Sequence, residues 1–181
     1  MRTEINGNLL ELKAGDITRQ RTEAIVNAAN GSLLGGGGVD GAIHRAAGKE
    51  LLEECKRIRK EVLNDHYLPT GEAVLTKGYQ LPASYVIHTV GPVWNNRGDE
   101  PRLLANCYQN SLELSRNKGV SSISFPSIST GVYGYPINQA APVALQTIIN
   151  FLQAQAFGDV VMTLFSEQDY QVYKQTLKEL L

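Results

Sequence analysis

Strand-like and helix-like stretches alternate along the whole of this 181-residue chain. Runs of β-branched and aromatic residues indicate the strands, and apolar residues at a spacing of three or four indicate the helices. We expect strands at residues 8–12, 24–27, 72–76, 85–90, 122–125 and 160–165. We expect helices at 39–63, where Gly48 could break the helix, and at 102–118, 138–155 and 167–180. This order is typical of an α/β domain in which helices cover both faces of a mostly parallel sheet. The closely spaced early strands favour a mixed sheet.

The length and the composition fit one compact domain spanning residues 1–181. Hydrophobic residues make up 43% of the chain, which is enough for a sizeable core. Seventeen basic residues stand against eighteen acidic ones, so the formal net charge is −1. A chain with this balance has no overall attraction to nucleic acid or to an acidic membrane surface. Any anionic ligand must therefore be bound by local groups.

The cysteines and histidines are too few and too scattered for a disulfide framework or a metal site. Cys55 and Cys107 both fall in expected helices, and the three histidines lack metal-binding spacing. The amino terminus, Met1-Arg2-Thr3-Glu4, does not begin an apolar signal segment, and no window approaches the roughly 18 apolar residues of a membrane span. We therefore expect a reduced, cytoplasmic protein without a bound metal.

Four consecutive glycines, Gly35 to Gly38, precede the expected helix that begins at Val39. Glycine allows close approach of a ligand to the backbone, and a helix start offers unpaired N–H groups to an anion. The spacing Gly36-x-Gly38-x-x-Gly41 nominally matches a dinucleotide-binding fingerprint. However, residues 28–35 separate it from the preceding strand, and no Gly-Lys-Ser/Thr follows. The run is either a flexible surface loop or a phosphate-binding loop of another kind.

Asp40 lies two residues after this glycine run, beyond Val39. An aspartate here could simply be the N-cap of the helix, but a carboxylate beside a bound phosphate would also accept a proton readily. His44 is one turn further along, where it could pair with Asp40 or pack as an ordinary buried histidine. The sequence has no Gly-x-Ser-x-Gly motif, so hydrolysis would depend on an activated water rather than on a serine nucleophile.

Two polar segments follow strands that we expect to be parallel. Asn27 ends the strand at 24–27 and Asn30 follows it. Either side chain could bind sugar hydroxyls or close the turn, and Asn30, nearer the glycine run, is the better candidate for a ligand contact. The second segment, residues 126–135, follows the strand that ends at Phe125. It contains hydroxyls, glycines and tyrosines, and it is either a ligand-binding loop or a simple Gly-rich turn. Ligands of open α/β sheets bind beyond the carboxyl ends of strands, where both segments are expected.

Asp16 follows Gly15 early in the chain. Its carboxylate could accept a hydrogen bond from an exocyclic amine, or it could cap a short helix that begins at Ile17.

Taken together, five segments of the chain resemble the macrodomain family, particularly its MacroD-type hydrolase branch. They are Gly15-Asp16-Ile17-Thr18, Val26-Asn27-Ala28-Ala29-Asn30, Gly35-Gly36-Gly37-Gly38-Val39-Asp40-Gly41-Ala42-Ile43-His44, His88-Thr89-Val90-Gly91-Pro92 and Ser127-Ile128-Ser129-Thr130-Gly131-Val132-Tyr133-Gly134. The resemblance covers essentially the whole chain in the same order. It implies a three-layer α/β/α sandwich that binds ADP-ribose. It also implies hydrolysis of O-acetyl-ADP-ribose and removal of mono-ADP-ribose from acidic side chains of proteins, without a cofactor.

The resemblance also implies a role for individual residues. Asp40 and Asn30 are the implied catalytic residues and face the distal ribose, with Asp40 and the ligand diphosphate orienting and deprotonating a water. Asp16 and the Ile17 amide would contact adenine, and Tyr133 would pack on the distal ribose. The implied diphosphate contacts are Gly37, Gly38 and Val39 on one side and Ser129, Thr130, Gly131 and Val132 on the other.

One position departs from the family pattern. Many relatives place an aromatic residue just after the last strand to cover the adenine, whereas Ser166 stands at the position that we align. Phe165 or Tyr170 could take its place. Two other functions would use the same cleft, namely non-catalytic recognition of ADP-ribosylated proteins and dephosphorylation of ADP-ribose 1″-phosphate.

Overall fold

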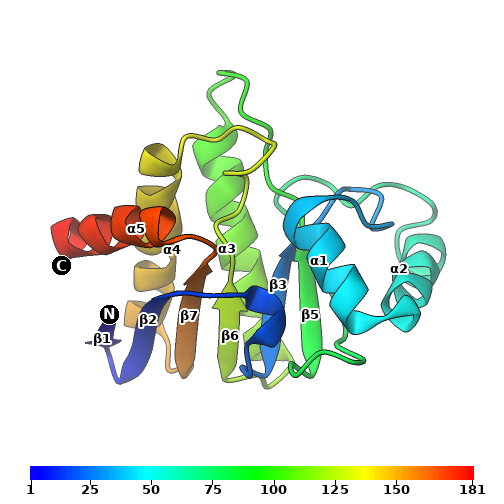
Figure 1. Cartoon of the computed structure of the whole chain (residues 1–181), viewed down its shortest axis with the longest axis horizontal. Helices are drawn as coiled ribbons and strands as arrows, with labels where there is room; N and C mark the ends of the chain where they lie inside the picture. The colour runs from blue at the N-terminus through cyan, green and yellow to red at the C-terminus, as the bar shows by residue number, and fades with distance from the viewer.

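A computed structural model describes all residues, 1–181, and contains one seven-stranded sheet (Figure 1). The strands are β1 (Arg2–Ile5), β2 (Asn8–Ala14), β3 (Ala24–Ala28), β4 (Ala73–Lys77), β5 (Tyr85–Thr89), β6 (Ser122–Phe125) and β7 (Asp159–Leu164). The helices are the short η1 (Ile17–Arg19), α1 (Gly38–Ala47), α2 (Lys49–Glu61), α3 (Glu100–Asn117), α4 (Ile137–Ala154) and α5 (Glu167–Leu180). No helix is long and apolar enough to cross a membrane.

The sheet is mixed and mostly parallel, as the sequence predicts. Its strand order is β1-β2-β7-β6-β3-β5-β4, and only the two edge strands β1 and β4 run antiparallel to their neighbours. One face packs against α3, α4 and α5, and the other against α1, α2 and η1. Figure 1 shows α1 and α2 together at one side of the molecule and α4 with α5 at the other. The expected three-layer α/β/α sandwich is confirmed.

Two local features follow from glycines with a positive φ. The helix expected at 39–63 is broken at Gly48, whose φ of 90° ends α1 and separates it from α2. The strand β1 was not predicted, because its short, partly charged sequence has no clear alternation. An Asn6-Gly7 turn with φ values of 52° and 80° folds it back on β2. Asn-Gly is a strong hairpin signal, and it indicates this strand in retrospect.

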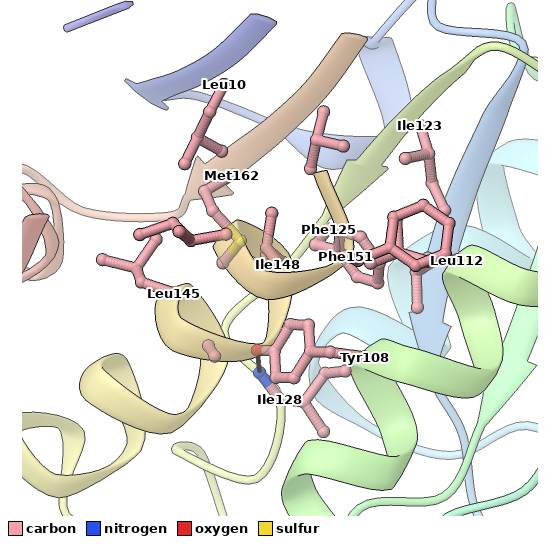
Figure 2. Close-up of a cluster of buried hydrophobic side chains, with 14 of the residues drawn as sticks. Leu10, Tyr108, Leu112, Ile123, Phe125, Ile128, Leu145, Ile148, Phe151 and Met162 are labelled. Carbon is pink, nitrogen blue, oxygen red and sulfur yellow. Dashed lines mark hydrogen bonds between the residues drawn. The ribbon is translucent and has the colours of Figure 1, made fainter. Parts of the chain in front are cut away.

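The larger core lies between the sheet and the helices α3 and α4 (Figure 2). Alternate residues of β6 and β7, such as Phe125 and Met162, point into it, as the period of two in a strand requires. Tyr108 of α3 is fully buried there, and its hydroxyl donates to the Pro126 carbonyl at 3.2 Å and accepts from the Ile128 N–H at 3.1 Å. The core therefore fixes the start of the loop that leaves β6.

Candidate active site

Two loops meet beyond the carboxyl ends of the neighbouring strands β3 and β6. The first contains the glycine run and leads into α1, and the second is residues 126–135. The hydroxyl of Tyr133 in the second loop donates to Oδ1 of Asn30 in the first, at 3.3 Å. These loops, far apart in sequence, therefore lie side by side at the carboxyl edge of the sheet.

The helix α1 begins at Gly38, with Gly37 as its N-cap. The interpretation of Asp40 as the N-cap is therefore wrong, because the helix starts two residues before Asp40. The first intrahelical hydrogen bond runs from the Gly41 N–H to the Gly37 carbonyl at 3.2 Å. The N–H groups of Gly38, Val39 and Asp40 therefore have no partner within the helix, and they are available to an anion. A β-carbon on Gly37 or Gly38 would have nothing within 4 Å, so this part of the loop is open.

Asp40 points inward from the first turn of α1 and is only 4% exposed. Its Oδ1 accepts a hydrogen bond from Asn27 Nδ2 at 2.9 Å, whereas its buried Oδ2 has no partner. His44 Nε2 lies 3.5 Å from the same Oδ1 but makes no hydrogen bond to it. One oxygen of the carboxylate is therefore held in place, and the other is left to interact with a ligand or a water.

A buried chain of polar side chains lies behind Asp40. Asn27 Nδ2 is 3.1 Å from His88 Nδ1, and His88 Nε2 is 3.0 Å from the hydroxyl of Thr76. These residues belong to β3, β5 and β4, and the alternation of strand side chains turns all three toward α1 and α2. Because the Asn27 amide donates to Nδ1, we assign the proton of the imidazole to Nε2.

The imidazole of His88 is held neutral by its surroundings. Complete burial lowers its pKa to about 3, and the charge of His44 acts in the same direction. The sequence did not indicate this chain, because Asn27 pointed only to a turn or a ligand contact and His88 to no role. The available signal was a histidine inside an otherwise apolar central strand. Cys55 Sγ lies 4.0 Å from His88 Nε2, and burial raises the pKa of this thiol to about 12, which keeps it protonated.

Asn30 and Asp40 approach each other across Gly36. A β-carbon on Gly36 would lie 2.5 Å from Asn30 Nδ2 and 3.3 Å from Asp40 Oδ2. Asn30 Nδ2 also donates to the Gly35 carbonyl at 2.9 Å, so its amide is fixed between the two loops. A residue larger than glycine at position 36 would therefore displace one of the two implied catalytic side chains.

Replacement of Gly41 with alanine is expected to lower the unfolding free energy by about 1–3 kcal/mol, although the same change in an exposed helix stabilises by about 1 kcal/mol. The reason is that the new β-carbon would collide with the backbone carbonyl of Gly36 and approach Arg45 Nη1 to 3.0 Å. Urea denaturation measures this effect. Gly37→Ala is the matched control, since open space and a φ of −93° should leave stability within about 1 kcal/mol. Equal effects of the two substitutions would contradict this packing.

The second loop is held from both sides. Ser129 has a φ of 69° and a buried hydroxyl without a partner, and it packs so closely on Gly91 that no side chain fits there. The Thr130 hydroxyl donates to the Ser127 carbonyl at 3.1 Å. The Tyr133 carbonyl accepts from the Trp94 N–H at 2.9 Å. Gly131 and Val132, between these contacts, are exposed. Their backbone is therefore accessible while the ends of the loop are fixed.

Asp16 is the N-cap of the short helix η1, as one of the two interpretations predicts. Its Oδ1 accepts from the backbone N–H and the hydroxyl of Thr18 at 2.9 and 2.7 Å, and these hydrogen bonds lower the pKa of the carboxyl. Ile17, the next residue, is buried against α1. The Gly15 N–H donates to the Leu164 carbonyl at 2.8 Å. Asp16, just after the end of β2, therefore lies beside the segment that follows the end of β7.

Of the aromatic residues near that end, only Phe165 is free to cover a ligand. Its side chain is 88% exposed. Tyr170 packs on the core, and its hydroxyl accepts from the amino group of Met1 at 3.2 Å. Ser166 is the N-cap of α5, where its hydroxyl accepts from the Asp169 N–H at 3.1 Å. No three His, Cys, Asp or Glu side chains come together in a way that could hold a metal ion.

The mixed sheet is that of an α/β domain, and a glycine-rich loop and a helix start lie at its carboxyl edge, an arrangement suited to an anionic ligand. The sequence pattern of the Macro domain matches residues 26–144. A macro domain-containing protein from Methanosarcina mazei is 48% identical over all of this chain and 94% of its own length. The O-acetyl-ADP-ribose deacetylase of Escherichia fergusonii is 48% identical over 91% of this chain and 93% of its own. This chain belongs to the macro domain family.

Solved structures agree with this assignment. A variant of the Oceanobacillus iheyensis macrodomain with ADPR superposes with a TM-score of 0.98 and is 61% identical, covering 99% of this chain and 97% of its own. The Trypanosoma brucei macrodomain in complex with ADP-ribose gives a TM-score of 0.84 at 44% identity, covering 93% of this chain and 68% of its own.

Proposed function

We propose that this protein is a hydrolase that binds ADP-ribose in the cleft between its two loops. Its substrates are O-acetyl-ADP-ribose and proteins that carry mono-ADP-ribose on acidic side chains, and residues 1–181 act as one macrodomain. The observation that carries the proposal is the carboxylate of Asp40, which is buried and held through Oδ1 while Oδ2 lacks a partner. The names of the Escherichia fergusonii relative and of the ADP-ribose complexes support the choice of substrate.

The diphosphate of the ligand lies between the two loops in this proposal. The start of α1 at Gly37, Gly38 and Val39 offers backbone N–H groups and the positive end of the helix dipole. The opposite side is the segment Ser129 to Val132, which is fixed at both ends. Backbone donors that are held before the ligand arrives bind charge without having to reorganise. Tyr133 and Asn30 then lie where the distal ribose follows the diphosphate.

Hydrolysis proceeds by attack of water on the ester that links the acyl group to the distal ribose. Asp40 Oδ2 and the diphosphate orient the water, and Asp40 accepts its proton as the oxygen bonds to the ester carbon. The carbon–oxygen bond of the ester breaks, and its electron pair stays on the departing oxygen, which takes up a proton. Attack at the carbonyl or at the anomeric carbon gives the same products, a carboxylic acid and ADP-ribose. Asn30 holds the ribose hydroxyls, and such positioning supplies much of the rate gain.

The adenine lies at the other end of the cleft, between Asp16 and Phe165. We expect Phe165→Ala to weaken ADP-ribose binding roughly tenfold, because stacking of a base on an aromatic ring contributes about 1–3 kcal/mol. Isothermal titration calorimetry measures the change. Tyr170→Phe is the control and should bind normally, since the Tyr170 hydroxyl contacts only the amino terminus. An unchanged Kd in Phe165→Ala would show that the exposed ring does not cover the adenine.

Calorimetry combined with product analysis tests the proposed function itself. The wild-type protein should bind ADP-ribose at one site and convert O-acetyl-ADP-ribose to acetate and ADP-ribose. Binding without turnover would identify a non-catalytic reader of ADP-ribosylated proteins, and absence of binding would refute the proposed site. Parallel assays with ADP-ribose 1″-phosphate rank the ester against the phosphate as substrate.

A further inference from the structure

A hollow of about 430 Å³ is lined by residues of the glycine run, of α1 and of the start of α2. Its lining includes Gly36, Gly41, His44, Arg45, Lys49 and Leu52. We call this hollow the α1–α2 groove. It shares Gly36 with the cleft described above, but the adenine and diphosphate positions proposed there do not use it.

The backbone of the glycine run and the side chain of His44 lie between this groove and Asp40. One side of Gly36 faces Asn30 and Asp40, as the position of its absent β-carbon shows, whereas its carbonyl oxygen packs against Gly41 in the groove. Gly36 is itself exposed, so the rim between the two spaces carries no side chain. A group attached to the distal ribose beside Asn30 can therefore pass over Gly36 into the α1–α2 groove.

The α1–α2 groove is cationic and its charges are unpaired. Arg45 and Lys49 are both exposed, and neither has a carboxylate within 4.0 Å. By contrast, Lys56 on the outer face of α2 pairs with Glu53 at 3.6 Å. No Asp or Glu lines the groove, and Arg45 Nη1 lies 3.0 Å from the position of a β-carbon on Gly41. The guanidinium of Arg45 thus lies beside Gly41 in the groove, and its N–H donors suit a carboxylate.

We propose that the α1–α2 groove is a subsite for the acceptor chain of the substrate, and that it binds acidic residues flanking the modified side chain. This inference rests on the proposed function, because the acceptor must be joined to the distal ribose. Arg45 and Lys49 pair with carboxylates of the acceptor, while Leu34 and Leu52 contact its apolar groups. The groove therefore selects acidic polypeptides, whereas the acetyl group of O-acetyl-ADP-ribose is too small to reach it.

Calorimetry with two stable peptides tests this subsite. Both carry ADP-ribose through an amide in place of the ester, so that neither is hydrolysed, and one has glutamates beside the attachment point where the other has alanines. The wild-type protein should bind the acidic peptide about three- to tenfold more tightly, since exposed ion pairs contribute roughly 0.2–1 kcal/mol each. The double variant Arg45→Ala/Lys49→Ala should lose this preference and keep its Kd for ADP-ribose.

Lys56→Ala is the matched control, because it removes a positive charge from α2 outside the groove and should retain the preference. Turnover of O-acetyl-ADP-ribose by the double variant should stay within about twofold of wild type. Equal binding of the two peptides by the wild-type protein, or a preference that survives in the double variant, would overturn the subsite. Failure of the proposed function is seen separately, as an absence of ADP-ribose binding or of acetate release by the wild type.

Discussion

Acetate release from O-acetyl-ADP-ribose is expected to fall about a thousandfold when Asp40 is replaced by asparagine. General base catalysis contributes about 10²–10⁴-fold, and an amide cannot accept the proton of the attacking water. The Kd for ADP-ribose should change by less than about threefold, because the substitution preserves size and leaves the backbone N–H groups of α1 in place. Initial rates at saturating substrate, together with calorimetry, separate the two effects.

Asp159→Asn is the matched control for this substitution. Asp159 begins β7, is exposed, and makes no side-chain contact with the cleft, so its amide variant should match wild type in turnover and binding. An Asp40→Asn protein that is folded, binds ADP-ribose and still releases acetate at the wild-type rate would remove Asp40 from the mechanism. Loss of both binding and turnover would instead assign Asp40 a structural role.

His88 is expected to make the protein less stable as the pH falls below about 6.5. Its pKa is 6.5 in an unfolded chain and about 3 in the folded one. Between these values the unfolded state binds more protons, so the unfolding free energy decreases with falling pH and is fully retained only above the unfolded pKa. The slope from this one group approaches about 1.4 kcal/mol per pH unit, or about 2–3 kcal/mol between pH 6.5 and roughly 4.5.

Urea denaturation over this pH range on wild type and His88→Gln measures the contribution. Glutamine keeps a donor for Thr76 and an acceptor for Asn27 but does not titrate, so the stability of the variant should depend less steeply on pH. His66→Gln is the control, because His66 is exposed and its replacement should leave the pH dependence unchanged. Parallel curves for wild type and His88→Gln would contradict the burial of a neutral imidazole.

Much of the fold could be predicted because its signals are local. The periods of strands and helices indicate the order from β2 to α5, and Gly48 marks the break between α1 and α2. The Asp16 cap is likewise a short-range interaction. The edge strand β1 was not predicted, because two of its four residues, Arg2 and Glu4, are charged. The strand is held mainly by its pairing with β2.

The site was only partly predictable, for a physical reason. The glycine run, Asn30 and the second loop are visible as motifs, and the position of both loops at the carboxyl edge follows from the expected parallel sheet. The chain from Asp40 through Asn27 and His88 to Thr76 depends on the register between three strands. No local pattern fixes such a register, so these contacts became visible only in the structure. The orientation of Asp40 was not predictable either, because it depends on the exact residue at which α1 begins.

Release of acetate from O-acetyl-ADP-ribose by the wild-type protein tests the central claim most directly. Proton NMR follows the acetyl ester and free acetate in one tube, at a substrate concentration well above the protein concentration. We predict many turnovers per protein molecule, with ADP-ribose and acetate formed in equal amounts. A protein that binds ADP-ribose yet leaves the ester at its spontaneous rate of hydrolysis would contradict the claim that this cleft is catalytic.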